Sequence, residues 1–200
     1  RHALKAPEKV LLYLTPSNGA EQAVTLLRHL EKFRPLMEAR RETRMGRMKY
    51  YHVHWPRQER FFRPGPKILA VRKCARPTFS YTEKEAYVMM AFNVIRSERV
   101  SMKYLAALFN SRLMQFWFLR RGKMQGDTAP VLRAPIRVPG LSLLREVEGL
   151  ADALAVRYCP EGDERMNELM EDIYGLSPQE REIIIQACSP MRAGRESLPE

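Results

Sequence analysis

The spacing of apolar residues changes at Ser101, and this change restricts the fold more than any other feature of the chain. Before it, short apolar runs between Pro- and Gly-containing turns predict strands at 9–14, 67–72, 78–81 and 86–95, and the aromatic-rich segment 49–56 also has strand propensity. After it, apolar residues recur every three or four positions, which predicts one long amphipathic helix ending at Gly122. Strands followed by helices in this way predict an α+β fold.

Several other segments carry helix signals. Apolar positions predict helices at 19–32, 143–158 and 163–174, and arginines at near-helical spacing indicate a helix or helix-to-loop segment at 36–48. Ser177, Pro178 and Glu180 form an N-cap, first-turn proline and capping-box pattern, which predicts a last helix to about Ala187. We therefore expect an irregular twisted β-region with flanking helices, followed by a C-terminal helical hairpin. The expected domains are a basic mixed one at 1–140 and an acidic helical segment at 141–200.

Basic and acidic residues are segregated along the chain, whose net charge is +11. Segment 34–80 holds thirteen Lys or Arg against three Glu, whereas segment 141–200 holds six basic against thirteen acidic residues. Such a basic half favours a surface for a polyanion, and nucleic acid is the first candidate. A generic solvated surface is the alternative that charge alone leaves open.

No catalytic residue and no metal ligand is predicted. A nuclease metal site needs a cluster of carboxylates, and the basic half offers only the scattered Glu38, Glu42 and Glu59. His52 and His54 could lie on one face of a strand, but no second pair of zinc ligands is visible, which favours a phosphate or core contact. Cys74 lies between basic residues without a nearby His, which favours a packed thiol.

Three scattered cysteines indicate reduced thiols and a cytoplasmic location. No apolar run approaches the roughly 18 residues of a membrane span. Because the sequence starts Arg-His-Ala without an initiator Met, we expect it to be part of a longer polypeptide.

The order of four segments resembles a known family. The segments are Pro66-Lys67-Ile68-Leu69 with Arg72, KYLAALFNSRL at 103–113, the loop 122–126 with APIRVP at 134–139, and YGLSPQE at 174–180. Over roughly 30–187 the chain resembles the C-terminal target-recognition domains of TaqI-like type II adenine methyltransferases, which are related to type I specificity subunits. Two features depart from the pattern: Arg137 replaces an apolar or neutral residue, and the loop has few glycines.

The resemblance implies sequence-specific recognition of double-stranded DNA within a restriction-modification adenine-N6 methyltransferase. S-adenosylmethionine is expected in a separate N-terminal domain, which also extrudes the adenine. This chain has no Pro-Pro dipeptide and no glycine cluster after a strand, so no cofactor is expected in it. The expected partners are DNA and the methyltransferase domain of the same polypeptide, and a fused nuclease is left open.

Three groups of residues, and Tyr51 beside the first of them, are expected to contact DNA. The phosphate contacts are assigned to Arg40, Arg41, Arg44, Arg47 and Lys49. The base edges are assigned to Arg72, Lys73, Arg76, Thr78 and Ser80. After the long helix, contacts with the DNA backbone are expected from Arg120, Arg121 and Lys123.

Several alternatives stay open for the aromatic residues and for Arg76. Tyr50 and Tyr51 can stack on DNA or anchor the β-layer, and Trp55 is expected in the core. The Met89-Met90 pair and the aromatic stripe 109–118 are also expected in the core. Arg76 can pair with Glu83 or Glu85 instead of reading a base. The rival function is a scaffolding domain whose basic face binds an acidic partner subunit.

Overall fold

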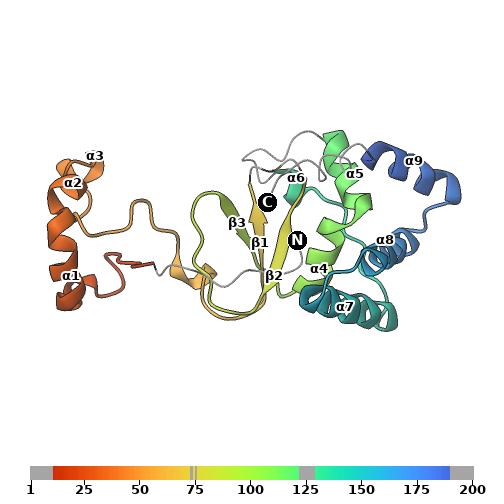
Figure 1. Cartoon of the computed structure of the whole chain (residues 1–200), viewed down its shortest axis with the longest axis horizontal. Helices are drawn as coiled ribbons and strands as arrows, with labels where there is room; N and C mark the ends of the chain where they lie inside the picture. Colours follow the sequence, from red (N-terminus) through yellow and green to blue (C-terminus); the bar gives the residue numbers. More distant parts are fainter. Residues whose placement is uncertain (1–10, 73, 75, 122–128, 190–200) are drawn as a thin grey trace. The chain divides into compact units, whose positions relative to one another are not determined.

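The computed structural model describes residues 11–72, 74, 76–121 and 129–189, and these divide into two compact units between Phe61 and Phe62. The residues are helical for the most part, with one small antiparallel sheet (Figure 1), which confirms the α+β class. Of the helices described, none combines the length and the apolar character that crossing a bilayer requires.

The smaller unit consists of short helices around a small apolar core. Its elements are the 3₁₀ helices η1 (Ala20–Gln22), η2 (Glu31–Phe33) and η3 (Glu59–Phe61) and the α-helices α1 (Val24–Leu30), α2 (Arg34–Glu38) and α3 (Arg41–Arg44). Leu14, Leu30 and Tyr51 form the core. A continuous helix at 19–32 was the wrong prediction, because Ala23 leaves the helical region at ψ 57° and separates η1 from α1.

Two strand predictions fail in the smaller unit. The described residues of the 9–14 run, 11–14, are not in a strand, and Lys9 and Val10 lie outside the described residues. The aromatic segment 49–56 forms turns instead of a strand. Apolar and aromatic residues promote a strand only where a neighbouring strand completes the backbone hydrogen bonds, and no strand of the described residues lies in this unit.

The sheet of the larger unit has the order β2-β1-β3, with both pairs antiparallel. Its strands are β1 (Lys67–Val71), β2 (Phe79–Thr82) and β3 (Phe92–Ile95). The prediction for 86–95 was too long, because β1 ends at Val71, which pairs with Phe92 at the start of β3. Met89 and Met90 are 63% and 65% exposed in the preceding loop, so their placement in the core was wrong.

The helices of the larger unit share one core with the sheet. They are α4 (Met102–Asn110), α5 (Arg112–Arg121), α6 (Ala129–Leu132), α7 (Leu141–Val156), α8 (Pro160–Tyr174) and α9 (Pro178–Cys188). α4 packs on β2 and β1, α7 packs on α4 and α8, and α9 packs on α5 (Figure 1). Phe79 of β2 lies among Phe109 and Phe118, at ring-centroid distances of 4.9 and 6.0 Å. The predicted capping box at Ser177 and Glu180 is confirmed, as is the end of α8 at Gly175.

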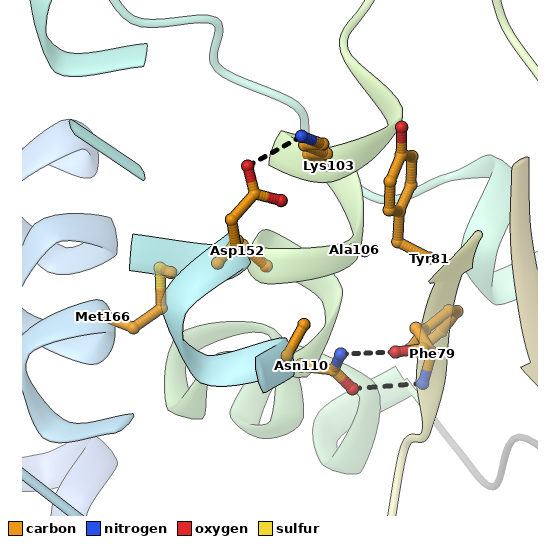
Figure 2. A pocket seen from close by; sticks show the side chains of 10 residues that line it. Phe79, Tyr81, Lys103, Ala106, Asn110, Asp152 and Met166 are labelled. Atoms are coloured by element: carbon orange, nitrogen blue, oxygen red, sulfur yellow. Dashed lines mark hydrogen bonds and ion pairs between the residues drawn. The ribbon is translucent and has the colours of Figure 1, made fainter. Parts of the chain in front are cut away.

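The prediction of a single helix from Ser101 to Gly122 was wrong, since Ser111 interrupts it and separates α4 from α5. Ser111 has an extended backbone (φ −65°, ψ 157°), and its hydroxyl donates to the carbonyl of Leu108 at 2.6 Å. The buried Asn110 side chain bonds the backbone of Phe79 in both directions, at 3.1 Å to the N–H and 2.6 Å to the carbonyl (Figure 2). These bonds to the sheet hold Asn110 at the end of α4 and allow α5 to begin in a new direction.

Arg112 joins the start of α5 to α8. Its backbone N–H donates to Asn167 Oδ1 at 2.7 Å, and its guanidinium donates to Glu171 at 2.7 and 3.0 Å and to Glu164 at 2.7 Å. The Arg112 and Glu171 side chains are only 6% and 2% exposed, so this pair is buried, although Arg112 also pairs with Glu164 and Glu171 also lies 4.0 Å from Arg181. Removing one partner of such a buried pair leaves the other charge in an apolar surrounding.

We predict that Arg112→Met lowers the free energy of unfolding by about 3–5 kcal/mol, because Glu171 loses its buried partner. Chemical denaturation of the chain measures this change. The matched control is Arg165→Met, which removes exposed pairs with Glu146 and Glu168 and is expected to cost no more than about 1 kcal/mol. Equal effects of the two substitutions would contradict the structural role of Arg112.

Candidate nucleic-acid interface

The arginine-rich segment of the smaller unit is one helical turn followed by a tight reversal. After α3, Gly46 has a left-handed conformation (φ +69°), its N–H donates to the carbonyl of Thr43 at 2.9 Å, and the N–H of Arg47 donates to that of Glu42 at 2.9 Å. This pair of bonds is a Schellman motif, which turns the chain out of the helix. Of the two arrangements left open by the sequence, the helix-to-loop segment is therefore the one observed.

Three arginines of this segment, Arg41, Arg44 and Arg47, project from the smaller unit. All three are exposed, and within the described part of the chain none of them forms an ion pair. Two other cations of the unit are neutralised locally: Arg34 bonds Glu31 at 2.9 Å and Glu38 at 2.7 Å, and Lys49 bonds Glu21 at 3.1 Å. The exposed trio concentrates positive charge in seven consecutive residues, which suits it to attract an anion.

Arg40 has a different role in the same segment. Its guanidinium donates to the backbone carbonyls of Met37 at 3.0 Å and His52 at 3.1 Å, and also to that of Tyr50. These bonds hold the aromatic segment against the end of α2. A guanidinium used in this way stabilises the fold of the unit, whatever else it contacts.

The two neighbouring tyrosines both make contacts inside the smaller unit. Tyr51 is buried with Leu14 and Leu30, and the ammonium of Lys49 lies 5.8 Å from the centre of its ring. Tyr50 is half-buried and donates its hydroxyl to Glu31 at 2.7 Å. Of the two roles left open for these residues, anchoring the unit is the one that these contacts support.

In the larger unit, the predicted base-reading residues surround the β1–β2 connection. Arg72 donates to the carbonyl of Met90 at 3.0 Å, Thr78 donates to that of Arg76 at 3.0 Å, and Ser80 is buried within β2. Arg76 donates its Nε–H to Gln115 of α5 at 2.9 Å. Lys73 lies outside the described residues. The structure thus orients Arg76 through α5, a contact that its sequence neighbours do not reveal.

The end of α5 carries two exposed arginines. The guanidinium groups of Arg120 and Arg121 lie over the rings of Phe116 and Trp117, at 5.3 and 5.7 Å from the ring centres. They follow Gln115 on the same helix by between one and two turns. The bond from Arg76 to Gln115 therefore brings the β1–β2 connection and this basic helix end into one region. Lys123 lies outside the described residues.

The acidic helices neutralise cations of their own unit. Asp152 pairs with Lys103 at 2.8 Å, Glu146 with Arg165 at 3.0 Å, and Asp172 with Arg181 at 2.7 Å. The negative charge of segment 141–200 is thus used in part to hold the helices together. This local pairing is an explanation of the charge segregation that needs no acidic partner subunit.

The histidines and the thiol contribute no metal site among the described residues, where no three His, Cys, Asp or Glu side chains come close enough to hold an ion. His52 is buried, and His54 is exposed and bonds Glu42 at 2.9 Å. Cys74 is half-buried, and burial raises the pKa of its thiol. These contacts confirm the packed interpretation of Cys74.

Trp55 is the residue whose sequence interpretation was most misleading. It was expected in the core, yet it is 64% exposed and has a left-handed backbone conformation (φ 54°). Together with His52, His54 and Arg47 it lines a hollow of about 200 Å³ in the smaller unit. The aromatic character of 50–55 signalled this site, but the sequence cannot show which aromatic ring faces outward.

Comparison with known proteins identifies one family. Residues 34–134 match the family model of the TaqI-like C-terminal specificity domain. The match spans the arginine-rich segment, the whole sheet, α4 and α5. Among curated proteins, no significant match to the sequence was found.

The contacts of Arg40 predict that Arg40→Ala loosens the smaller unit while Arg41→Ala leaves it intact. Loss of the bonds to the carbonyls of residues 37, 50 and 52 is expected to cost about 1–3 kcal/mol of local stability. Hydrogen exchange of the peptide that contains residues 49–53 measures this cost. Equal exchange in the two variants would show that the Arg40 contacts do not stabilise the segment.

Proposed function

Because the chain belongs to the family of TaqI-like C-terminal specificity domains, we propose that it recognises a target sequence in double-stranded DNA. The observation that supports this function most directly is the exposed trio Arg41, Arg44 and Arg47 inside the matched region, for which no ion pair is formed with any residue that the structure describes. Arginines that lack an acidic partner in the protein are available to phosphates, and phosphate contacts supply much of the affinity for duplex DNA.

The proposal assigns positioning and reading to different parts of the chain. The exposed trio in the smaller unit, with Arg120 and Arg121 at the end of α5, contacts phosphates and sets the register on the duplex. Arg76 reads a base edge from the β1–β2 connection, where its bond to Gln115 limits the directions that the guanidinium can take. An arginine of restricted geometry suits the two parallel hydrogen bonds that guanine offers in the major groove.

We place the chain within a restriction-modification adenine-N6 methyltransferase. In this arrangement a methyltransferase domain of the same polypeptide binds S-adenosylmethionine and takes the target adenine out of the duplex. The present chain selects the site and supplies no step of the methyl transfer.

The first prediction concerns the phosphate contacts. Arg44→Ala is expected to weaken binding to all duplexes alike and to reduce the slope of log affinity against log salt by about one, because one phosphate contact is lost. Fluorescence anisotropy between about 50 and 200 mM salt measures both effects. The matched control is Arg34→Ala, since Arg34 lies in the same unit and is also exposed but is already paired with Glu31 and Glu38.

The salt dependence also separates the proposal from a scaffolding role. A DNA-binding protein loses affinity steeply over this range, whereas a scaffold that binds an acidic subunit has little duplex affinity to lose. Unchanged slopes in Arg44→Ala would show that this arginine makes no phosphate contact.

The second prediction concerns base reading by Arg76. Selection of preferred sites from a random duplex library, with the wild type and with Arg76→Ala, is expected to show relaxed choice at one base pair. On the wild-type site the variant should lose about 1–3 kcal/mol of binding free energy, with little loss on random DNA. Arg120→Ala serves as the control, because loss of a backbone contact weakens both kinds of DNA. Equal losses on both kinds of DNA for Arg76→Ala would contradict its reading role.

A further inference from the structure

The smaller unit contains a hollow of about 200 Å³ whose residues belong to the reversal after α3 and to the aromatic segment. Its lining is formed by Pro16, Glu42, Arg47, Met48, His52, Val53, His54, Trp55 and Pro56. Sites for drug-sized ligands and cofactors measure about 300–1,000 Å³, so this hollow suits one ring system better than a complete cofactor. The hollow in Figure 2, between β2, α4 and α7 of the larger unit, measures only about 50 Å³ and contains the Lys103–Asp152 pair, in which both charges are already neutralised.

Trp55 presents the largest aromatic surface of the hollow. Its side chain is 64% exposed, and its left-handed backbone (φ 54°) is unfavourable for a bulky residue, all the more so before Pro56. The neighbouring His54 ring lies 5.7 Å away at a tilt of 55°. The fold thus holds an indole ring at the surface in a strained conformation, as is common where a protein contacts a ligand.

His52 supplies an unused polar group to the same hollow. Its side chain is only 4% exposed, its Nδ1 accepts the N–H of Lys49 at 3.4 Å, and its Nε2 has no hydrogen-bond partner among the described residues. Burial lowers the pKa of His52, which keeps the ring neutral. In the neutral ring Nε2 then carries the proton, so His52, a residue that lines the hollow, holds a buried donor without an acceptor among the described residues.

Charged groups at the hollow define the rest of its chemistry. Arg47 is exposed and unpaired among the described residues, and the Schellman reversal carries it away from α3 toward this side of the unit. The carboxylate of Glu42 bonds His54 at 2.9 Å. The hollow therefore combines a flat aromatic surface, a buried hydrogen-bond donor and an exposed cation.

We propose that this hollow binds one nucleobase that has left the base stack of the bound DNA. The base stacks on Trp55, and Arg47 contacts the adjacent phosphate. An aromatic ring beside an exposed arginine is the usual combination for an unstacked nucleotide, since every base has a face for stacking. The inference rests on the proposed DNA binding and adds a site for a single base.

The test uses the full chain and four probes: a paired duplex, the same duplex with a one-nucleotide 2-aminopurine bulge, the same duplex with an abasic bulge, and free deoxyadenosine monophosphate. The wild type is expected to bind the bulge that carries a base about tenfold more tightly than the abasic bulge, with quenching of the 2-aminopurine fluorescence. Trp55→Ala is expected to abolish both the preference and the quenching while keeping the affinity for paired duplex.

Two further variants keep the test specific. Phe33→Ala removes another exposed aromatic ring of the smaller unit, which does not line the hollow, and is expected to keep the preference. Trp55→Phe keeps a stacking surface and is expected to keep a reduced preference. A Trp55→Ala protein that retains duplex affinity also shows that the substitution has not unfolded the unit.

Each contrary outcome has a distinct meaning. Equal wild-type affinity for the two bulges overturns the base site and leaves the proposed DNA binding intact. Binding of free deoxyadenosine monophosphate that depends on Trp55, without a preference between bulges, overturns the assignment to a base of the DNA. Absence of affinity for every duplex contradicts the proposed function itself.

Discussion

The three consecutive residues Asn110, Ser111 and Arg112 determine how the larger unit is assembled. Asn110 bonds both backbone groups of Phe79 and so attaches α4 to the sheet, and Ser111 interrupts the helix. Arg112 then attaches α5 to α8 through the buried pair with Glu171. Because all these groups are buried, each of these hydrogen bonds and ion pairs is costly to break. The sheet and the C-terminal helices are therefore both attached to the same three residues. The Asn-Ser pair that suggested the family in the sequence therefore has a structural role.

The arginines of the chain fall into structural and available groups by their partners. Arg112 is buried with carboxylates, Arg40 is bonded to backbone carbonyls, and Arg34 is paired at the surface. Arg44 and Arg47 have no ion-pair partner among the described residues. The net charge of the chain thus overstates its capacity for DNA, since Arg112, Arg40 and Arg34 offer charge only after a contact is broken. Burial and partners, more than sequence spacing, indicate which cations serve the proposed function.

The sequence predicted which kinds of residue form the candidate site, but only in part which of them are exposed. The basic segment, its aromatic neighbours and the basic end of α5 follow from residue type alone, as does the α+β class. The side of the protein on which each ring lies does not follow, as Tyr51 and Trp55 illustrate: they are four positions apart, and one is buried while the other is 64% exposed. The unpartnered Nε2 of His52 also depends on its surroundings, because a histidine acquires a donor role only from the partner of its other nitrogen.

By itself, the sequence determined the elements whose signals are local. The capping box at Ser177 and the end of α8 at Gly175 depend on contacts within a few residues, and apolar runs between turn residues mark β1 and β2, so the sequence places these elements. Only the tertiary structure decided the break at Ser111, the late start of β3 at Phe92 and the exposure of Trp55. The reason is physical. A helix or strand continues only where its backbone hydrogen bonds are completed. Here groups that are distant in the sequence decide this: the backbone of Phe79 holds the end of α4, and the end of β1 determines where β3 begins.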